Sequence, residues 1–402
     1  MVFKEDISAA YSGQQNFLGK ENQFVERDYL KTLNPSSSHV EVIAGIRRCG
    51  KSTMMRQIAD RFYKKVAYFN FEDSRVFGFE VGDFSKLDEV IGQDVEAYFF
   101  DEIQNVSGWE VFVRQLHERG EKVFVTGSNA SLLSKELGTR LTGRHLSHEV
   151  FPFSYGEYLA YFSSTDTQDT FKKYLLNGGF PEFLRDQNPE ILQMLLKDIL
   201  FRDIAVRYGI KNTHVLMDIG LYLISNIGKE VSFNGLRNTF NVGSPTTVSD
   251  YLSWMEDAYL LFFLPRFSWS AKNVSKNPKK VYCIDTGFAK SNSLSFTKDE
   301  GRLLENLVYL NLRKKFRKLY YFRERQECDF VVFDGNTCKW VIQVCSTFHP
   351  DNRDREIAGL MEAMEFLEME SGLIITLNQN DEIIKNGKTI TIMEVRKFLT
   401  WI

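Results

Sequence analysis

The chain has no apolar run near the length of about 18 to 20 residues that a helix needs to cross a bilayer. Its first residues, MVFKEDISAAYSGQQ, show no basic segment followed by an apolar one, so the pattern of a signal peptide is missing. From these two absences we expect a cytoplasmic protein with no membrane partner.

Paired cysteines, prolines and net charge are also scarce. The 5 cysteines are scattered without a Cys-x-x-Cys pair, which argues against a disulfide framework and a structural zinc site. With 8 prolines and 43% hydrophobic residues, the composition gives no case for disorder. A net charge of -3 gives no general attraction to nucleic acid, so such binding would need a local basic patch. At 402 residues the chain is long enough for two or three domains.

Residues 40–130 alternate short β-branched or aromatic runs with longer helical patterns, which is typical of a parallel α/β sheet. The expected strands are VEVIAGI, KKVAYFNF, DVEAYFFDE and EKVFVTGSN. Helical patterns follow over 151–207, with a glycine and proline break at 177–181. Residues 215–285 then run helix, helix, turn, helix and two strands, with Ser244 as an N-cap before Pro245, and this order predicts a winged helix-turn-helix.

A glycine-rich motif of the form G-x-x-x-x-G-K-[ST] lies between the first expected strand and a helix. In such a loop the backbone N–H groups face phosphates, while Lys51 reaches the β and γ phosphates and Ser52 ligates Mg2+. The strand before it and the helix after it distinguish the motif from a chance glycine turn. It therefore predicts a site for a nucleoside triphosphate and Mg2+, formed by Gly45, Ile46, Arg47, Arg48, Cys49, Gly50, Lys51, Ser52 and Thr53.

Two carboxylates follow the apolar run AYFF. Asp101 stands where a nucleoside triphosphatase needs a carboxylate for the magnesium shell, and Glu102 stands where a base can deprotonate the attacking water. The alternative is an Asp-Glu pair on the surface at a strand end. Ser128 and Asn129 end the next expected strand, and either is a candidate to contact the γ-phosphate or the water. For Asn129, a role as a loop cap is the alternative.

Five motifs in this order, GIRRCGKST, YFFDE, FVTGSNASLL, LTGRHLSHEVFPFSYGEYL and NGGFPEFL, resemble the AAA+ ATP-binding proteins of bacteria and archaea that carry a C-terminal domain of unknown function. The resemblance covers almost the whole chain. It implies a P-loop AAA+ core with a parallel α/β sheet at 1–160, a helical lid at 161–212, and Ser128 or Asn129 as sensor 1.

The same resemblance makes Arg144 the first candidate and Arg140 the second for an arginine finger, supplied by the same chain or by a neighbour. A finger from a neighbour would favour a homo-oligomer. The alternative is that both are solvated charges at helix ends. The lid motif GGFP is similar to that of related signal-transducing ATPases, whose proline packs near the adenine, which makes Pro181 a candidate contact. Otherwise Pro181 simply begins a helix.

The winged helix, assigned to 213–285, carries a basic segment after its recognition helix. That helix exposes no Lys or Arg, so base-specific readout is not expected, but the segment WSAKNVSKNPKK is a candidate for contacting DNA phosphates. A solvated charge run or a docking element for a protein is the alternative. The candidate nucleic-acid residues are Lys272, Lys276, Lys279 and Lys280, with Trp269 nearby.

The last segment, 286–402, resembles the scaffold of the PD-(D/E)XK nucleases, with Glu305 on a helix and Asp329 inside a strand. Where an active member has Glu-x-Lys, this chain has Gln343-Val344-Cys345. One carboxylate ligand and the catalytic lysine are both missing, so we expect a degenerate site without nuclease activity, in which Glu305 and Asp329 are structural remnants.

These features together predict a Mg2+-dependent, ATP-hydrolysing AAA+ protein that acts as a nucleotide-driven switch on DNA or on a protein partner. One alternative is a DNA-binding regulatory module whose ATP site only sets its conformation. Another is an active metal-dependent nuclease.

Overall fold

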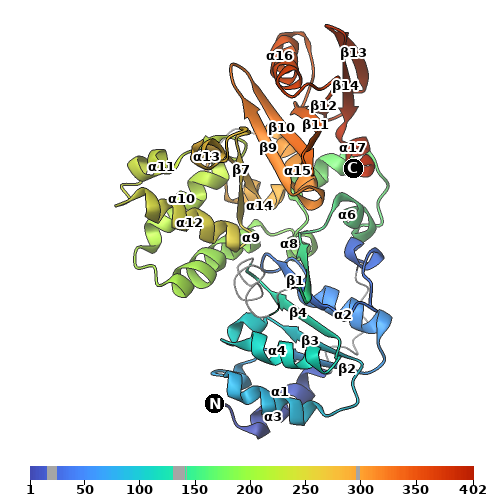
Figure 1. The fold of residues 1–402 in the computed structure, drawn as a ribbon, viewed down its shortest axis with the longest axis vertical. Coiled ribbons are helices and arrows are strands. Elements are labelled where there is room, and N and C mark those ends of the chain that lie inside the picture. The colour runs from blue at the N-terminus through green and yellow to red at the C-terminus, as the bar shows by residue number, and fades with distance from the viewer. Residues whose placement is uncertain (16–24, 130–140, 142, 296–298) are drawn as a thin grey trace. The chain divides into compact units, whose positions relative to one another are not determined.

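The structure is a computed structural model that describes residues 1–15, 25–129, 141, 143–295 and 299–402. These residues form two compact units, Met1–Ser163 with Asp257–Tyr259, and Ser164–Glu256 with Leu260–Ile402. Each unit has its own fold (Figure 1). Among the described helices, none combines the length and the apolar composition that crossing a bilayer requires.

The first unit is built on a five-stranded parallel sheet with the strand order β2, β3, β4, β1, β5. Strands β1, β3 and β4 are buried along their whole length, as their apolar runs predict, because strands of a parallel sheet are covered on both faces. The carboxyl ends of all strands therefore lie at one edge. The strands are β1 (Val40–Gly45), β2 (Val66–Asn70), β3 (Ala97–Asp101), β4 (Val123–Gly127) and β5 (His145–Val150).

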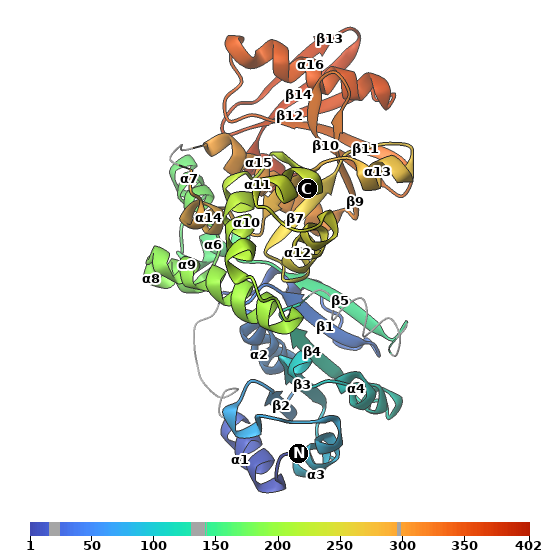
Figure 2. The same cartoon turned by 90° about the vertical axis from the view of Figure 1, so that its left-hand side faces the viewer.

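Strand β5 is the element of this sheet that the sequence did not reveal. Its residues, HLSHEV, are mostly polar, and of them only Val150 is buried. The backbone ladder with β1 holds this edge strand, so it needs no alternating apolar pattern. Helix α2 contacts β1, β3 and β4, and α1 lies beside α3 and β2 (Figure 2). The described helices of the unit are α1 (Lys4–Gln15), α2 (Lys51–Phe62), α3 (Phe84–Ile91), α4 (Trp109–Glu118), α6 (Tyr155–Tyr161) and the short 3-10 turns η1 (Asp28–Lys31), η2 (Ser74–Val76), η3 (Val81–Asp83) and η4 (Ile103–Asn105).

The second unit begins with helices on either side of the glycine break. Pro181 is the first residue of a helix, where a missing N–H costs no hydrogen bond. These helices are α7 (Gln168–Asn177), α8 (Pro181–Asp186), α9 (Pro189–Asp198) and the π-helix η6 (Ile199–Val206).

The break itself packs against the start of α14 (Thr286–Asn292). A Cβ on Gly178 would lie 2.0 Å from Oδ1 of Asp285, and one on Gly287 would lie 1.9 Å from the Asn177 carbonyl oxygen. The Asp285 carboxylate accepts the N–H of Gly179 at 2.7 Å. Gly178 and Gly287 are therefore needed for close packing of two helix ends.

Four helices and a three-stranded antiparallel sheet follow among the described residues. The Ser244 hydroxyl accepts the N–H of Thr247 at 3.1 Å and so caps the helix that begins at Pro245. The sheet has the order β6, β8, β7, and its first strand is two residues long, too short for a recognisable pattern. The elements are α10 (Thr213–Ser225), β6 (Glu230–Val231), α11 (Phe233–Thr239), α12 (Pro245–Asp257), β7 (Leu261–Pro265), α13 (Ala271–Lys276) and β8 (Lys279–Cys283).

The rest of the unit is a six-stranded mixed sheet in the order β13, β14, β12, β11, β10, β9 (Figure 1). Pairs β9–β10 and β10–β11 are antiparallel, whereas β11–β12 and β12–β14 are parallel. Helices α15 and α16 both contact β10 and β11. The elements are α15 (Glu300–Lys315), β9 (Lys318–Arg323), β10 (Glu327–Asp334), β11 (Thr337–Val344), α16 (Pro350–Phe366), β12 (Ser371–Thr376), β13 (Asp381–Lys385), β14 (Lys388–Glu394) and α17 (Val395–Trp401).

Candidate nucleotide-binding site

The loop of residues 45–50 leaves β1 and enters α2 at the carboxyl edge of the five-stranded sheet. Arg48 and Gly50 have φ values of 63° and 97°, so the loop turns through two left-handed positions before α2 begins at Lys51. A Cβ on Gly45 would lie 2.1 Å from the Val150 carbonyl oxygen, so the close approach of β5 requires glycine there. The loop therefore sits at a helix N-terminus, where backbone N–H groups and the helix dipole favour an anion.

Lys51 is buried at the base of this loop, with 4% of its side chain exposed. Its ammonium donates to the carbonyl oxygens of Gly45 at 3.1 Å and Ile46 at 3.2 Å, and lies 3.5 Å from Oε1 of Glu102. Burial lowers the pKa of Lys51, but the neighbouring acidic groups, above all Glu102, outweigh this effect and raise the pKa overall. The lysine thus carries a positive charge at neutral pH.

Asp101 ends β3 and is fully buried. Its carboxylate accepts hydrogen bonds from the hydroxyls of Tyr68 at 2.8 Å, Thr126 and Ser52. Burial and the neighbouring charge of Glu102 raise the pKa of Asp101, against the opposing effect of these hydrogen bonds. Ser52 and Asp101 are therefore side by side, as the two oxygen donors of a magnesium site must be.

Glu102 is also buried and has the left-handed φ of 51°. The Gln104 amide donates to Oε2 of Glu102 and, at 3.3 Å, to the Ser128 hydroxyl, while the Glu102 N–H donates to Thr126 at 2.9 Å. Burial raises the pKa of Glu102, but Lys51 and Gln104 outweigh it and lower the pKa overall. Glu102 is thus an ionised carboxylate, held in place and able to accept a proton.

The other residues predicted from the motifs take supporting places. Within the loop, Ile46 and Cys49 have buried side chains. Burial raises the pKa of the Cys49 thiol, so it is not a reactive thiolate. Arg47 reaches Glu72 at 3.3 Å, and Arg48 is exposed. Thr53 lies half-buried in the first turn of α2, and Asn129 is buried just after β4, next to Ser128.

A buried arginine that sequence reasoning missed anchors the loop. Arg27 donates from Nη1 to the Cys49 carbonyl oxygen at 2.8 Å, from Nη2 to that of Phe151 at 2.6 Å, and from Nε to Glu157 at 2.9 Å. Glu157 also accepts the N–H of Asp28 at 2.8 Å. The motif FPFSYGEYL, which follows β5, therefore supports the phosphate-binding loop through Glu157. The sequence feature that could have indicated this role is an acidic residue inside an otherwise mostly apolar helix.

Arg144 lies far from the loop within the same unit. Its carbonyl oxygen accepts the N–H of Val40, at the amino end of β1, and its guanidinium contacts Glu118 at 3.0 Å. Since a strand rises about 3.3 Å per residue, the length of β1 separates Arg144 from Gly45 by roughly 16 Å. From this position Arg144 does not reach the loop of its own chain, so the two remaining interpretations are an arginine finger that acts on a neighbour and a solvated surface charge paired with Glu118. Arg140 lies outside the described residues.

The residues present fit ATP and magnesium. The loop, the charged Lys51 and the N-terminus of α2 converge at one edge of the sheet, and Ser52 with Asp101 offers a hydroxyl and a carboxylate within one hydrogen bond. Ser52 and Asp101 would hold Mg2+, which would supply positive charge against the phosphates. Three residues that the sequence did not predict hydrogen-bond to the two carboxylates: Tyr68 and Thr126 to Asp101, and Gln104 to Glu102. Of these, only Thr126 could have been recognised from the sequence, as a polar residue within a buried strand.

The four lysines of the basic segment separate in the structure. Lys272 and Lys276 are exposed on α13, and Lys279 is half-buried at the start of β8. Lys280 is 1% exposed, and its ammonium contacts Asp329 at 2.8 Å and Glu305 at 3.0 Å. The prediction that Lys280 contacts nucleic acid is therefore wrong, because β8 is buried from Lys280 to Cys283 and the ammonium is paired with buried carboxylates.

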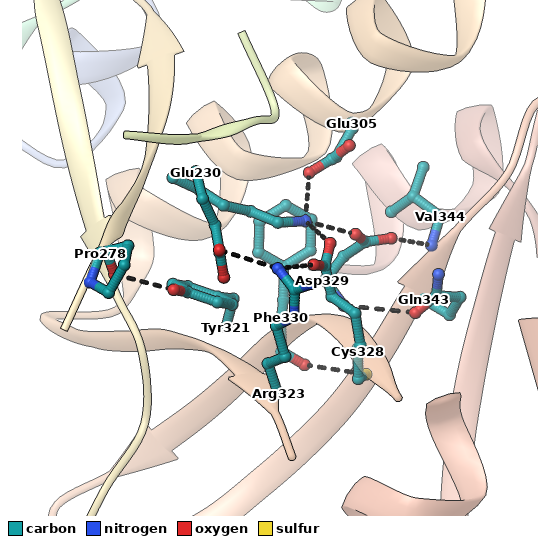
Figure 3. A network of polar contacts seen from close by, with 12 residues as sticks. Glu230, Pro278, Glu305, Tyr321, Arg323, Cys328, Asp329, Phe330, Gln343 and Val344 are labelled. Atoms are coloured by element: carbon teal, nitrogen blue, oxygen red, sulfur yellow. Dashed lines mark hydrogen bonds and ion pairs between the residues drawn. The ribbon is translucent and has the colours of Figure 1, made fainter. Parts of the chain in front are cut away.

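Of the residues predicted to form a degenerate nuclease site, Glu305, Asp329 and Gln343 belong to one network of polar contacts around Asp329 (Figure 3). Gln343 accepts the N–H of Asp329 at 3.2 Å and donates to Glu356 at 2.7 Å. Cys345 is buried, and burial raises the pKa of its thiol to about 12. Among the residues that the structure describes, no three His, Cys, Asp or Glu side chains are grouped as a metal site requires.

Comparison with known proteins agrees with this fold. Residues 37–159 match an AAA domain, and residues 168–299 and 300–398 match two domains of unknown function, DUF8612 and DUF4143. The chain is 34% identical over 392 residues to the uncharacterised protein MJ1544 of Methanocaldococcus jannaschii, covering 91% of this chain and 87% of that protein. An uncharacterised protein of Haemophilus influenzae is 30% identical over 332 residues, covering 77% of this chain and 80% of the relative.

Solved structures with a similar arrangement include the Walker-type ATPase PABY2304 of Pyrococcus abyssi, with a TM-score of 0.40 and 13% identity over 73% of this chain and 96% of that one. The structure of the ORC1 protein of Aeropyrum pernix in complex with DNA matches with a TM-score of 0.28 and 12% identity. The match covers 73% of this chain and 92% of the ORC1 chain. Scores this low carry no argument about function.

The parallel sheet, the P-loop and the AAA domain match define a nucleotide-binding ATPase of the AAA+ superfamily with further C-terminal domains of unknown function. Within that superfamily, the chain belongs to the family of MJ1544 and the Haemophilus influenzae protein.

Proposed function

We propose that this protein hydrolyses ATP in a Mg2+-dependent reaction and uses the nucleotide state as a switch on a partner, either DNA or another protein. The observation that carries the proposal is the pair of Glu102 and Gln104. A carboxylate that only balanced Lys51 would not need an amide to hold it, whereas a base for the attacking water does.

The assignment of roles follows from the contacts. Lys51 supplies positive charge to the β and γ phosphates, Ser52 and Asp101 hold Mg2+, and Glu102 accepts the proton of the attacking water. Gln104 orients Glu102, and its Oε1 has no hydrogen-bond partner among the described residues, so it is available to accept one from that water. Ser128 anchors the amide of Gln104 and, with Asn129, remains the proposed sensor of the γ-phosphate.

Steady-state ATP turnover and ATP binding by wild type, Lys51→Ala and Glu102→Gln test this proposal. We expect Lys51→Ala to lose binding, and Glu102→Gln to bind ATP with unchanged Kd while kcat falls at least about 100-fold. Lys64→Ala, which removes an exposed charge beyond the end of α2, is the control and should keep both binding and turnover. Turnover by Glu102→Gln at the wild-type rate would remove Glu102 from the mechanism.

The domain roles in the second unit are part of the proposal. We assign residues 161–212 to a lid in which Pro181 lies near the adenine, 213–285 to a winged helix and 286–402 to an inactive nuclease-like domain. The order of α10, β6, α11, α12, β7 and β8 supports the second assignment, and α15 followed by three antiparallel strands supports the third.

A DNA-binding function is the second candidate, and the exposed side chains of Lys272, Lys276 and Trp269 favour it. A salt-sensitive shift of labelled duplex by wild type, reduced in Lys272→Ala with Lys276→Ala, would support DNA as the partner. Absence of binding at low salt would leave a protein as the partner. ATP turnover measured with and without the duplex then shows whether DNA and hydrolysis are coupled.

A further inference from the structure

The carboxylate centre of the second unit contains a cation that belongs to the chain itself. The ammonium of Lys280, on β8, lies 2.8 Å from Oδ1 of Asp329, 3.0 Å from Oε1 of Glu305 and 2.7 Å from Oε1 of Glu327. Glu305 comes from α15, and the other two carboxylates come from β10. One buried ammonium thus joins the three-stranded sheet to the six-stranded sheet and its helix.

Burying a lysine is costly unless its charge is matched at close range. Burial lowers the pKa of Lys280, but Asp329 and Glu305 more than offset this and raise the pKa well above its usual value. Conversely, burial and the nearby Asp329 raise the pKa of Glu305 to about 7, against the opposing charge of Lys280. Without the lysine, two buried carboxylates would face each other with no positive charge between them.

Several other polar atoms of the centre also have protein partners. Oδ2 of Asp329 accepts the N–H of Val344 at 2.9 Å, and the Gln343 side chain accepts the N–H of Asp329 (Figure 3). The amide nitrogen of Gln343 donates to Glu356. The Tyr282 hydroxyl donates to Oε1 of Glu305 at 2.7 Å, the same oxygen that Lys280 contacts. The network is arranged around the ammonium.

We propose that Lys280 is a built-in cation that closes this centre, occupying with its ammonium the position that a divalent metal would otherwise take between Glu305 and Asp329. It reaches the centre from a strand 25 residues before Glu305 and 49 before Asp329. The domain therefore keeps its carboxylates for a structural reason, which is to fasten β8 to α15 and β10. The inference is independent of ATP hydrolysis.

The stability arm of the test uses Lys280→Met, which keeps the length of the side chain and removes its charge. We expect a fall in Tm of about 10 °C at pH 8, because breaking a buried pair leaves the carboxylates uncompensated. The deficit should shrink at pH 5, because burial raises the pKa of Glu305 to about 7 and this carboxylate then takes up a proton. The charged and titratable groups around the ammonium are Tyr282 of β8, Glu305 of α15, Glu327 and Asp329 of β10, Tyr321 and Arg323 of β9, Glu230 of β6, and Arg355 and Glu356 of α16.

Two further variants serve as controls in the stability measurement. Lys276→Met removes an exposed lysine four residues earlier and should leave Tm within about 1 °C of wild type. The charge-balanced chain Lys280→Met with Glu305→Gln and Asp329→Asn should regain at least half of the lost Tm, and it provides the test even if Lys280→Met alone does not fold. If the balanced chain recovers nothing, Lys280 is not the counterion of this centre and the proposal is overturned.

The metal arm measures Mn2+ binding by isothermal titration calorimetry on the full chain without nucleotide. Mn2+ suits oxygen ligands, so Lys280→Ala should bind one Mn2+ more than wild type and gain Tm on its addition. Adding Asp329→Asn to the same chain should abolish the extra site. If Lys280→Ala binds no more Mn2+ than wild type, the ammonium does not stand in for a metal, and that result also overturns the proposal.

Discussion

Nε of Arg27 lies 2.9 Å from Oε1 of Glu157, so a residue that precedes β1 meets one 130 positions later beside the phosphate-binding loop. The two side chains are 7% and 5% exposed. The same guanidinium holds the Cys49 carbonyl oxygen, so the ion pair fixes the loop as well as the fold. Nucleotide affinity should therefore depend on a residue outside every nucleotide-binding motif.

Glu157→Gln tests that dependence. Because a buried partner is lost, we expect the free energy of unfolding to fall by about 3 kcal/mol and the Kd for ATP to rise about tenfold. Urea denaturation and ATP titration measure the two effects. The control is Arg61→Ala, which removes an exposed pair with Glu26 and should change stability by less than about 1 kcal/mol. An unchanged Kd in Glu157→Gln would limit the pair to a structural role.

Gln104 should act through Glu102. Gln104→Leu keeps the volume but removes the donor to Glu102, whose pKa then rises since Gln104 is among the groups that lower it. We expect kcat to fall about tenfold at pH 7, Kd for ATP to stay constant, and the acid limb of the pH–rate profile to move to higher pH. Asn105→Ala, at the exposed neighbouring position, is the control. A lower kcat with an unshifted acid limb would contradict this route.

Arg144 is expected to act on a neighbouring chain. Arg144→Ala should lower kcat at least about 100-fold while ATP binding persists, and mixing it with Lys51→Ala chains should restore part of the turnover. The matched control is Arg114→Ala, because Arg114 contacts the same Glu118 at 2.8 Å. Equal turnover in wild type and Arg144→Ala at every protein concentration would show that Arg144 is only a surface charge.

Asp285 should make stability depend on pH. Burial raises its pKa to about 6, although the N–H groups of Phe288, Gly179 and Gly287 oppose the shift. The folded state thus binds a proton more tightly than the unfolded state, so this contribution is greatest below about pH 4 and is lost as the pH rises to 6. Relative to Asp285→Asn, wild type should lose about 3 kcal/mol across that window in urea denaturation. A difference that stays constant with pH would rule out Asp285 as the titrating group.

The phosphate-binding loop and its carboxylates were readable because each depends on a local pattern. A strand, a glycine turn and a helix follow one another at 40–62, and Asp101 directly ends a buried strand. Parallel pairing then brings the strand ends to one edge whatever the intervening helices are. Strand β5 was missed because an edge strand of polar residues has no alternation to read.

By itself, therefore, the sequence determined the P-loop and the places of Ser52, Asp101 and Glu102, the residues proposed to hold magnesium and to act as the base, since all follow from order along the chain. Only the tertiary structure decided which charges are buried and what they meet. It placed Arg144 at the edge of the sheet away from the loop, paired Arg27 with Glu157, and turned Lys280 from a basic surface into a carboxylate centre. Composition assigns a lysine to solvent, whereas strand register and long-range packing determine whether its ammonium reaches water or a buried carboxylate.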